Sequence, residues 1–302
     1  MTTDLAAFSI SHRTTLRYTE AISLSYNEVR MRPRDRGTQR TLTFALLTRP
    51  QAVPRSRVDY FGNVVHRVDV SEPHTMLSID VEAVVEHGAV KARRLSRWNR
   101  EQLERDPRLE YALRSPRVPL DPSTSRMLDE WVGEDRSWDA LLEITARIQR
   151  EFRYLAGATT VDSSIDELLE GGAGVCQDFT HLFLALARHA GWPARYVSGY
   201  LGPRGEEESV VGASHAWAEV CGSGGQWVGL DPTHGGPTGL HHLRLAVGRD
   251  YGDVAPHRGL FFGSGAGLPP EVEVRISRMT PQQVGVVHRG NAVTWQQQIQ
   301  QQ

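Results

Sequence analysis

The pattern of apolar and polar residues changes its period along the chain. Between residues 7 and 88, segments such as FSISHRTTLRY, RTLTFALLTRP and LSIDVEAVVEH alternate apolar with polar residues, which is typical of strands with one buried face. Turn-forming residues separate these segments, as in YFGNVV, where Gly62 and Asn63 tolerate positive φ. We therefore expect a β-rich N-terminal domain, a sheet or a sandwich, over residues 1–90.

From residue 122 onward the apolar spacing becomes helical. The segment SWDALLEITARIQREF places four apolar residues, from Leu141 to Phe152, on one helix face, and Ser137 is positioned to cap the first turn. The preceding segment, DPSTSRMLDEWV, predicts a shorter helix that Ser123 or Thr124 caps. Beyond residue 191, the segments ARYVSGYL, SHAWAEV and QWVGLDP again have the pattern of strands. This order of elements predicts an α+β fold.

The composition of the remaining segments divides the chain further. Residues 91–121 are rich in Arg, Pro and Asp, which favours a linker between the β-rich domain and a core at 122–260. Residues 261–302 are expected to hold C-terminal strands and a tail, WQQQIQQQ, whose low complexity favours fraying.

Charge and cysteine content exclude several classes of partner. The formal net charge is −2, so we expect neither a nucleic-acid nor a membrane partner. No apolar run reaches about 18–20 residues, and we expect no signal peptide. Only two cysteines occur in 302 residues, which favours a cytoplasmic, reducing setting. A disulfide between Cys176 and Cys221 remains an alternative, and the oligomeric state is not indicated.

Cys176 lies where a loop of small residues becomes a helix, in GAGVCQDFTHLFLALARHAG. The apolar spacing places this cysteine in the first turn, and Gly191 and Pro193 end the helix. The unpaired N–H groups at a helix start favour a thiolate and could also donate to an oxyanion. The alternative interpretation is a small buried apolar residue, which is the commonest environment of a free cysteine.

A thiolate nucleophile requires a base and a group that orients the base. SHAWAEV and QWVGLDP are separated by CGSGG, so they predict a hairpin. If the turn centres on Ser223, His215 lies directly opposite Asp231, close enough for the carboxylate to accept from the imidazole. A slip of one residue would place the two side chains on opposite faces. Alternatively, His215 is a histidine of the core or surface and Asp231 starts a turn.

The other histidines near these motifs are assigned no chemistry. His181 lies well around the helix from Cys176 and is expected to pack or to support the site. His234, His241 and His242 lie in loop-like sequence and are expected to be solvated.

Three segments resemble the catalytic core of the transglutaminase-like superfamily, in particular its soluble bacterial proteins. They are GVCQDFTHLFLALARHAGWPARYVSGYL, SHAWAEV and WVGLDPTH. The resemblance implies a papain-like fold in which the cysteine-bearing helix packs on an antiparallel sheet. It implies Cys176 as nucleophile, His215 as base and Asp231 as the residue that orients the base.

The resemblance extends beyond the core. Three N-terminal segments resemble the all-β domain that precedes this core in bacteria: RMRPRDRGTQR, DYFGNVVH and EPHTMLSI. A later segment, GRDYGDVAPHRG, resembles one that follows the core. In the core, it implies that Gln177 and Asp178 shape the oxyanion region and cap the helix. Tyr154 is implied as an oxyanion donor, and Trp217 is expected to shield the site from water.

The resemblance implies thiol-dependent acyl transfer on an amide, either a peptide bond or a glutamine carboxamide, through a thioester. Water would resolve the thioester in a peptidase or amidase, and a primary amine would resolve it in a transglutaminase. The expected partner is a peptide or protein amide, with an amine as a possible co-substrate. We expect no cofactor and no metal, since CxxC, HExxH and PCxxC motifs and calcium loops are missing from the sequence. A catalytically silent binding or scaffold protein and a zinc enzyme are the alternatives.

Overall fold

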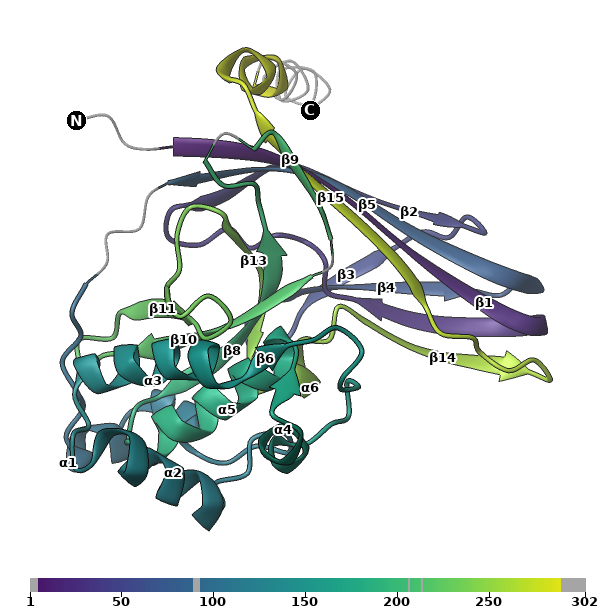
Figure 1. Ribbon diagram of the computed structural model, residues 1–302. Helices are drawn as coiled ribbons and strands as arrows, with labels where there is room; N and C mark the ends of the chain where they lie inside the picture. Colours follow the sequence, from purple (N-terminus) through teal and green to yellow (C-terminus); the bar gives the residue numbers. More distant parts are fainter. Residues whose placement is uncertain (1–4, 89–92, 206, 213, 289–302) are drawn as a thin grey trace.

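Two antiparallel sheets and a helical layer make up the part of the chain that the computed structural model describes, residues 5–88, 93–205, 207–212 and 214–288 (Figure 1). The larger sheet has eight strands: β1 (Leu5–Val29), β2 (Gln39–Arg49), β3 (Arg55–Val58), β4 (Val64–Val70), β5 (His74–Gly88), β9 (Ser209–Gly212), β14 (His257–Gly263) and β15 (Glu271–Met279).

Strand β1 organises this larger sheet because it pairs with four other strands. Its first part, to Arg17, pairs with β5 and β15, and its second part, from Ile22, pairs with β4 and β14. The path order β2-β5-β1-β15-β9 places strands from the C-terminal region beside strands from the N-terminal region. The tail WQQQIQQQ lies outside the described residues.

The smaller sheet has five strands in the order β12-β11-β10-β8-β13. These are β8 (Ala194–Leu201), β10 (His215–Cys221), β11 (Trp227–Asp231), β12 (Gly236–Pro237) and β13 (His242–Gly248). A short parallel pair, β6 (Arg153–Tyr154) and β7 (Ala173–Gly174), lies just before the cysteine-bearing helix.

Helices cover one face of the smaller sheet (Figure 1). The described helices are α1 (Arg100–Glu104), η1 (Pro107–Ala112, a 3-10 helix), α2 (Pro122–Val132), α3 (Trp138–Glu151), α4 (Ile165–Gly171), α5 (Cys176–His189) and α6 (Tyr251–Val254), and residues 281–288 are also helical. Of these, α2, α3, α4 and α5 share an apolar core with the smaller sheet. In the described ranges, none of the helices combines the length and the apolar character needed to cross a membrane. On β10, the small residues Ala216 and Ala218 face α5. The large apolar side chains of α5 can therefore approach the sheet closely.

The helix boundaries follow local signals, with one exception. Ser137 caps α3, as predicted, by accepting a hydrogen bond from the Ala140 N–H at 3.3 Å. The predicted cap of α2 at Ser123 or Thr124 is wrong, because this helix begins at Pro122 with Asp121 as its N-cap. Proline suits the first helical position, since its fixed φ is helical and its missing N–H would have no partner there.

Residues within the predicted linker contain α1 and η1 and pack on the end of the smaller sheet. The Trp98 indole N–H donates to the Cys221 carbonyl at 3.0 Å, and Leu103 packs in the same apolar cluster. The segment therefore covers the end of the smaller sheet at which Cys221 lies.

The two sheets share an apolar core. Phe8 and Ile10 of β1 pack with Tyr200 and Leu243 of the smaller sheet, and all four side chains are buried. The Tyr200 hydroxyl also lies 2.6 Å from Nδ1 of His12. This shared core holds the larger sheet against the part of the chain that bears the cysteine.

Candidate active site

Cys176 is the first residue of α5, where its partly exposed side chain lies beside the free N–H groups of the helix start. Asp178 caps this end by accepting from the Val175 N–H at 2.8 Å and from the Thr159 hydroxyl at 2.6 Å. The residue before Val175 must be glycine, because a Cβ on Gly174 would lie 2.8 Å from the Asp178 carboxylate. Glycine at position 174 thus leaves room for the Asp178 carboxylate to form the cap.

His215 and Asp231 come from neighbouring strands, and Nε2 of His215 lies 2.8 Å from Oδ2 of Asp231. The predicted register of the hairpin is wrong by two residues, since Ala218 pairs with Leu230 and Cys221 with Trp227. The turn is displaced because Gly225 adopts a φ of +79°. A shift of two residues keeps both side chains on the same face, so the hydrogen bond forms diagonally across the pair.

The surroundings of His215 favour its protonated form. Burial alone would lower the pKa of this imidazole, but hydrogen bonds and charge interactions with Asp231 and Cys176 outweigh burial and raise the pKa to about 9. Burial alone would likewise raise the pKa of Asp231, but the hydrogen bonds from histidines lower it instead. The electrostatics therefore favour an imidazolium between a carboxylate and the Cys176 sulfur.

Tyr154, at the end of β6, also reaches the sulfur. The pKa of its hydroxyl is raised, first by burial and then by the charge of Cys176 and a hydrogen bond to it. Tyr154 and His215 both line one cavity, and both interact with Cys176. The hydroxyl is thus placed to donate to a group that reacts at the sulfur.

The two remaining predicted residues support the site from behind. Gln177 is buried, and its Nε2 donates to the Val161 carbonyl at 3.1 Å, so this amide holds the preceding loop. Trp217 is 1% exposed and stacks against the imidazole of His215 with ring centroids 6.1 Å apart. Its indole lies across β8, where a Cβ on Gly199 would lie 2.3 Å from the ring.

Asp231 collects more hydrogen bonds than the sequence suggests. Besides His215, its Oδ2 lies 2.7 Å from Nδ1 of His234 and 3.0 Å from Nε2 of His242, and its Oδ1 accepts from the Thr233 N–H at 2.9 Å. Nδ1 of His242 accepts from the Gly239 N–H, so Nε2 of this ring carries the proton that it donates to Asp231. The carboxylate is therefore held in one orientation from several sides.

The expectation that His242 is solvated is wrong, because this residue begins β13 and is 4% exposed. The segment after Asp231 crosses the end of the sheet and returns His242 to the same carboxylate, which the Gly- and Pro-rich sequence does not indicate. His241 packs on His242, and burial followed by the charge of His242 lowers its pKa to about 3. His234 is 37% exposed and His181 packs internally, where its Nε2 accepts from the Tyr251 N–H.

Metal binding and disulfide formation were the other chemistries open to these residues. One ligand atom each from His215, Asp231 and His234 lies within 4.8 Å of the other two. These same atoms form the hydrogen bonds around Oδ2, so a cation there would have to displace the imidazole protons. Cys176 and Cys221 are both free thiols, and burial raises the pKa of Cys221.

Residues 8–86 match the bacterial transglutaminase-like N-terminal region, and residues 122–232 match the transglutaminase-like superfamily. An uncharacterized protein of Mycobacterium leprae is 31% identical over 280 residues, which cover 89% of this chain and 98% of the relative. The chain belongs to the transglutaminase-like superfamily. A relative in Mycobacterium tuberculosis is 29% identical over 288 residues, covering 89% of this chain and 92% of its own length.

The fold of this transglutaminase-like protein also matches a solved structure. A crystal structure of a protein from Cytophaga hutchinsonii, named as a candidate cysteine protease, superposes with a TM-score of 0.73 at 22% identity and covers 91% of this chain and 98% of that one. The predicted α+β fold class, with a cysteine-bearing helix on an antiparallel sheet after a strand-rich region, is confirmed.

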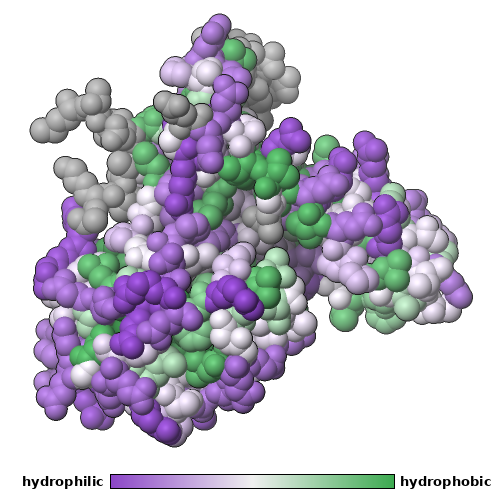
Figure 2. Space-filling model, in the orientation of Figure 1, coloured by the Kyte–Doolittle hydropathy of each residue, from purple (hydrophilic) through white to green (hydrophobic). Residues whose placement is uncertain are grey.

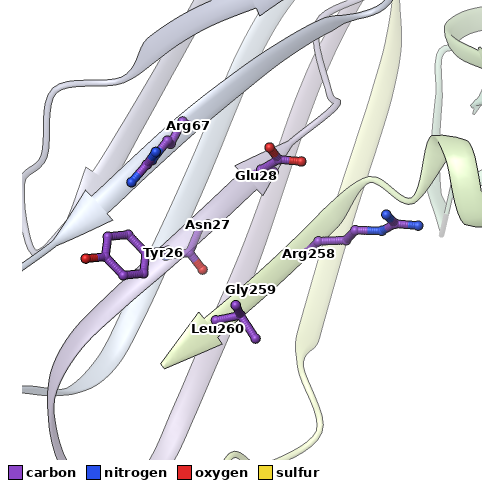
Figure 3. Close-up of a pocket in the computed structure, with 7 residues that line it drawn as sticks. All are labelled: Tyr26, Asn27, Glu28, Arg67, Arg258, Gly259 and Leu260. Carbon is purple, nitrogen blue, oxygen red and sulfur yellow. The ribbon is translucent and has the colours of Figure 1, made fainter. Parts of the chain in front are cut away.

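One cavity of the transglutaminase-like protein lies on the larger sheet, and none of the candidate site residues lines it. It has a volume of about 690 Å³ and lies between β1, β4 and β14, where Tyr26, Glu28, Arg67 and Arg258 surround it (Figure 3). A second cavity, of about 300 Å³, contains His215 in its lining. The larger of these two cavities is therefore not the one that borders the candidate site.

The raised pKa of His215 predicts a pH-dependent stability. Its pKa is about 9 in the folded protein and about 6.5 when unfolded, so protonation stabilises the fold fully below pH 6.5, and this contribution is lost as pH rises through 9. We expect the difference in unfolding free energy between wild type and His215→Gln to shrink by about 3 kcal/mol from pH 6 to pH 10. Urea denaturation at both pH values measures it, and parallel pH profiles of the two proteins would contradict the assignment.

Proposed function

We propose that this protein is an enzyme that transfers an acyl group from a peptide or glutamine amide to water or to a primary amine, with Cys176 as nucleophile. The observation that carries the proposal is the 2.8 Å hydrogen bond from His215 to Asp231, made by an imidazole that also interacts with Cys176. A nucleophile, a base and a group that orients the base are the parts that such chemistry requires.

In the proposed mechanism, the thiolate of Cys176 attacks the carbonyl carbon of the amide, and the carbonyl π electrons move to oxygen. N–H groups at the start of α5 and the Tyr154 hydroxyl donate to this oxyanion. The imidazolium of His215 gives its proton to the leaving nitrogen as the C–N bond breaks, which produces a thioester and a free amine or ammonia.

The second half of the reaction releases the acyl group. Neutral His215 takes a proton from water or from a primary amine, whose oxygen or nitrogen attacks the thioester carbon. The C–S bond then breaks and returns the thiolate and the imidazolium. Asp231, held by His234 and His242, keeps His215 in one ring orientation through both halves.

The proposed setting follows from the same chemistry. A catalytic thiol requires a reduced cysteine, so we propose a cytoplasmic location with a peptide or protein amide as substrate. We propose no nucleic-acid or membrane partner, in line with the small net charge of −2.

Peptide mixtures incubated with and without a primary amine test the proposal by mass spectrometry. Hydrolysis adds water to a cleaved amide, whereas transamidation replaces ammonia or the leaving peptide with the added amine. We also expect iodoacetamide to label Cys176 much faster than Cys221, which is fully buried and whose pKa is raised by burial. Equal, slow labelling of both cysteines together with no product from any amide would favour a scaffold protein.

A further inference from the structure

The cavity beside His215 has walls from both sheets. Tyr154 and Leu201 lie on the side of the helical part, and β9 and β15 contribute Val210 and Val274 from the larger sheet. The volume of about 300 Å³ is enough for one or two apolar side chains, and five aliphatic side chains line the cavity: Leu201, Val210, Val211, Val274 and Ile276. Arg204 and Glu207 contribute charged groups to the same lining. Hydrophobic residues also gather in the crease between the helical part and the long strands (Figure 2).

Strand β9 forms the edge of the larger sheet next to this cavity (Figure 1). It pairs with β15 on one side, with Val210 opposite Ile276 and Val211 opposite Arg275. Within the described residues, no strand pairs with its other side. An edge of this kind presents unpaired N–H and C=O groups to any extended chain that approaches.

The register identifies which backbone groups are unpaired. The Arg278 N–H donates to the Glu208 carbonyl at 2.8 Å, which makes these two residues a hydrogen-bonded pair. Because such pairs alternate along antiparallel strands, Val210 also bonds to β15, whereas the N–H and C=O of Ser209 and Val211 point away from it. These outward groups lie on the edge that borders the cavity.

The outward edge is also close to the reacting residues along the chain. Three residues lie between Val211 and His215, so their Cα atoms are at most about 14 Å apart. An extended chain that passes Val211 would therefore span the distance to His215, whose imidazole interacts with Cys176, in about four residues.

We propose that an extended peptide segment of the substrate adds as a strand to the outer edge of β9, with alternate apolar side chains entering the cavity beside His215. This inference rests on the proposed function, because the docked chain leads to Cys176. Main-chain hydrogen bonds to Ser209 and Val211 supply affinity, and the cavity supplies a preference for apolar side chains at alternate positions. The outer edge of β9 borders the cavity, and the cavity is lined by His215 of the candidate active site. This arrangement favours an extended substrate peptide as the occupant.

The test uses a peptide of eight residues with a C-terminal chloromethyl ketone, which labels a thiol without turnover of an amide. A series of these probes carries one N-methyl group at successive backbone nitrogens, and the labelling rate of Cys176 in the full-length protein is measured. We expect labelling about 10-fold slower for N-methylation at alternate positions, since each methyl removes one donor to β9, and unchanged rates at the positions between.

A proline substitution tests the same edge from the protein side. Val211→Pro removes an outward N–H that does not bond to β15, so we expect peptide labelling to fall about 10-fold while iodoacetamide labelling stays unchanged. Val58→Pro is the matched control, because Val58 is an exposed residue on β3. The next residue, Asp59, forms a hydrogen-bonded pair with Asn63, so the N–H of Val58 points away from β4. We expect this control to label at the wild-type rate.

Each outcome decides between the two proposals. Rates that are independent of the N-methyl position would overturn strand addition, even if peptides are turned over. Alternating rates with no turnover of any amide would keep strand addition and overturn the proposed enzyme. If Val211→Pro also slows iodoacetamide, the substitution has altered the active site, and the N-methyl series on the wild-type protein decides.

Discussion

Cys176→Ala is expected to reduce amide turnover by roughly 10⁴-fold or more, because acyl transfer through a thioester has no route without the sulfur. The substitution leaves the fold intact, since the side chain is partly exposed and the cap of α5 is formed by Asp178 and Val175. Turnover of the best peptide is measured by mass spectrometry, with circular dichroism as a check on folding.

Cys221→Ala is the matched control for this experiment. Cys221 is buried against Trp98 and Leu103 on the far end of β10, so its replacement is expected to lower stability without lowering turnover. Equal turnover by wild type and Cys176→Ala would rule out the thioester mechanism.

Glu219→Ala is expected to lower the free energy of unfolding by about 3–5 kcal/mol. Glu219 is 1% exposed and forms ion pairs with Arg195 and Arg244 across the smaller sheet. Burial alone would raise the pKa of Glu219, but the charges and hydrogen bonds of the two arginines outweigh it and lower the pKa to about 2. Removal of the carboxylate would leave buried positive charges unpaired, and Arg34 close to them adds to the repulsion.

The control for this prediction is an exposed ion pair. Glu104 lies one turn from Arg100 at 2.8 Å on α1, and its side chain is 54% exposed. We expect Glu104→Ala to change the free energy of unfolding by no more than about 0.5 kcal/mol, since water screens such pairs. Chemical denaturation at pH 7 measures both variants. Similar small losses for both would show that the buried carboxylate contributes little.

Several local features of the fold were predictable because neighbours along the chain determine them. The apolar period placed Leu141, Ile144 and Ile148 on the buried face of α3, and Gly191 ends the segment after α5 with a φ of +78°. The turn at Gly62 and the cap at Ser137 follow from side-chain and backbone geometry within a few residues. The same kind of signal placed Cys176 on the first turn of its helix.

The hairpin of β10 and β11 marks the limit of local inference. The glycines of CGSGG indicated a turn but not its centre, and the register moved by two residues. His215 and Asp231 still meet, because the period of a strand is two and an even shift preserves the face. An odd shift, which the sequence does not exclude, would have separated them.

The sequence by itself therefore determined the strand-rich beginning, the cysteine at a helix start, and the strands that bear His215 and Asp231, because each depends on periodicity and turn chemistry over about ten residues. Only the tertiary structure decided that His242 returns to Asp231 and that β14 and β15 join β1. It also decided that β9 lies beside His215. These contacts join segments that lie on different strands or far apart in the chain. The segments are brought together because the two sheets bury a common apolar core. Neither segment alone carries a periodic signal that indicates its partner.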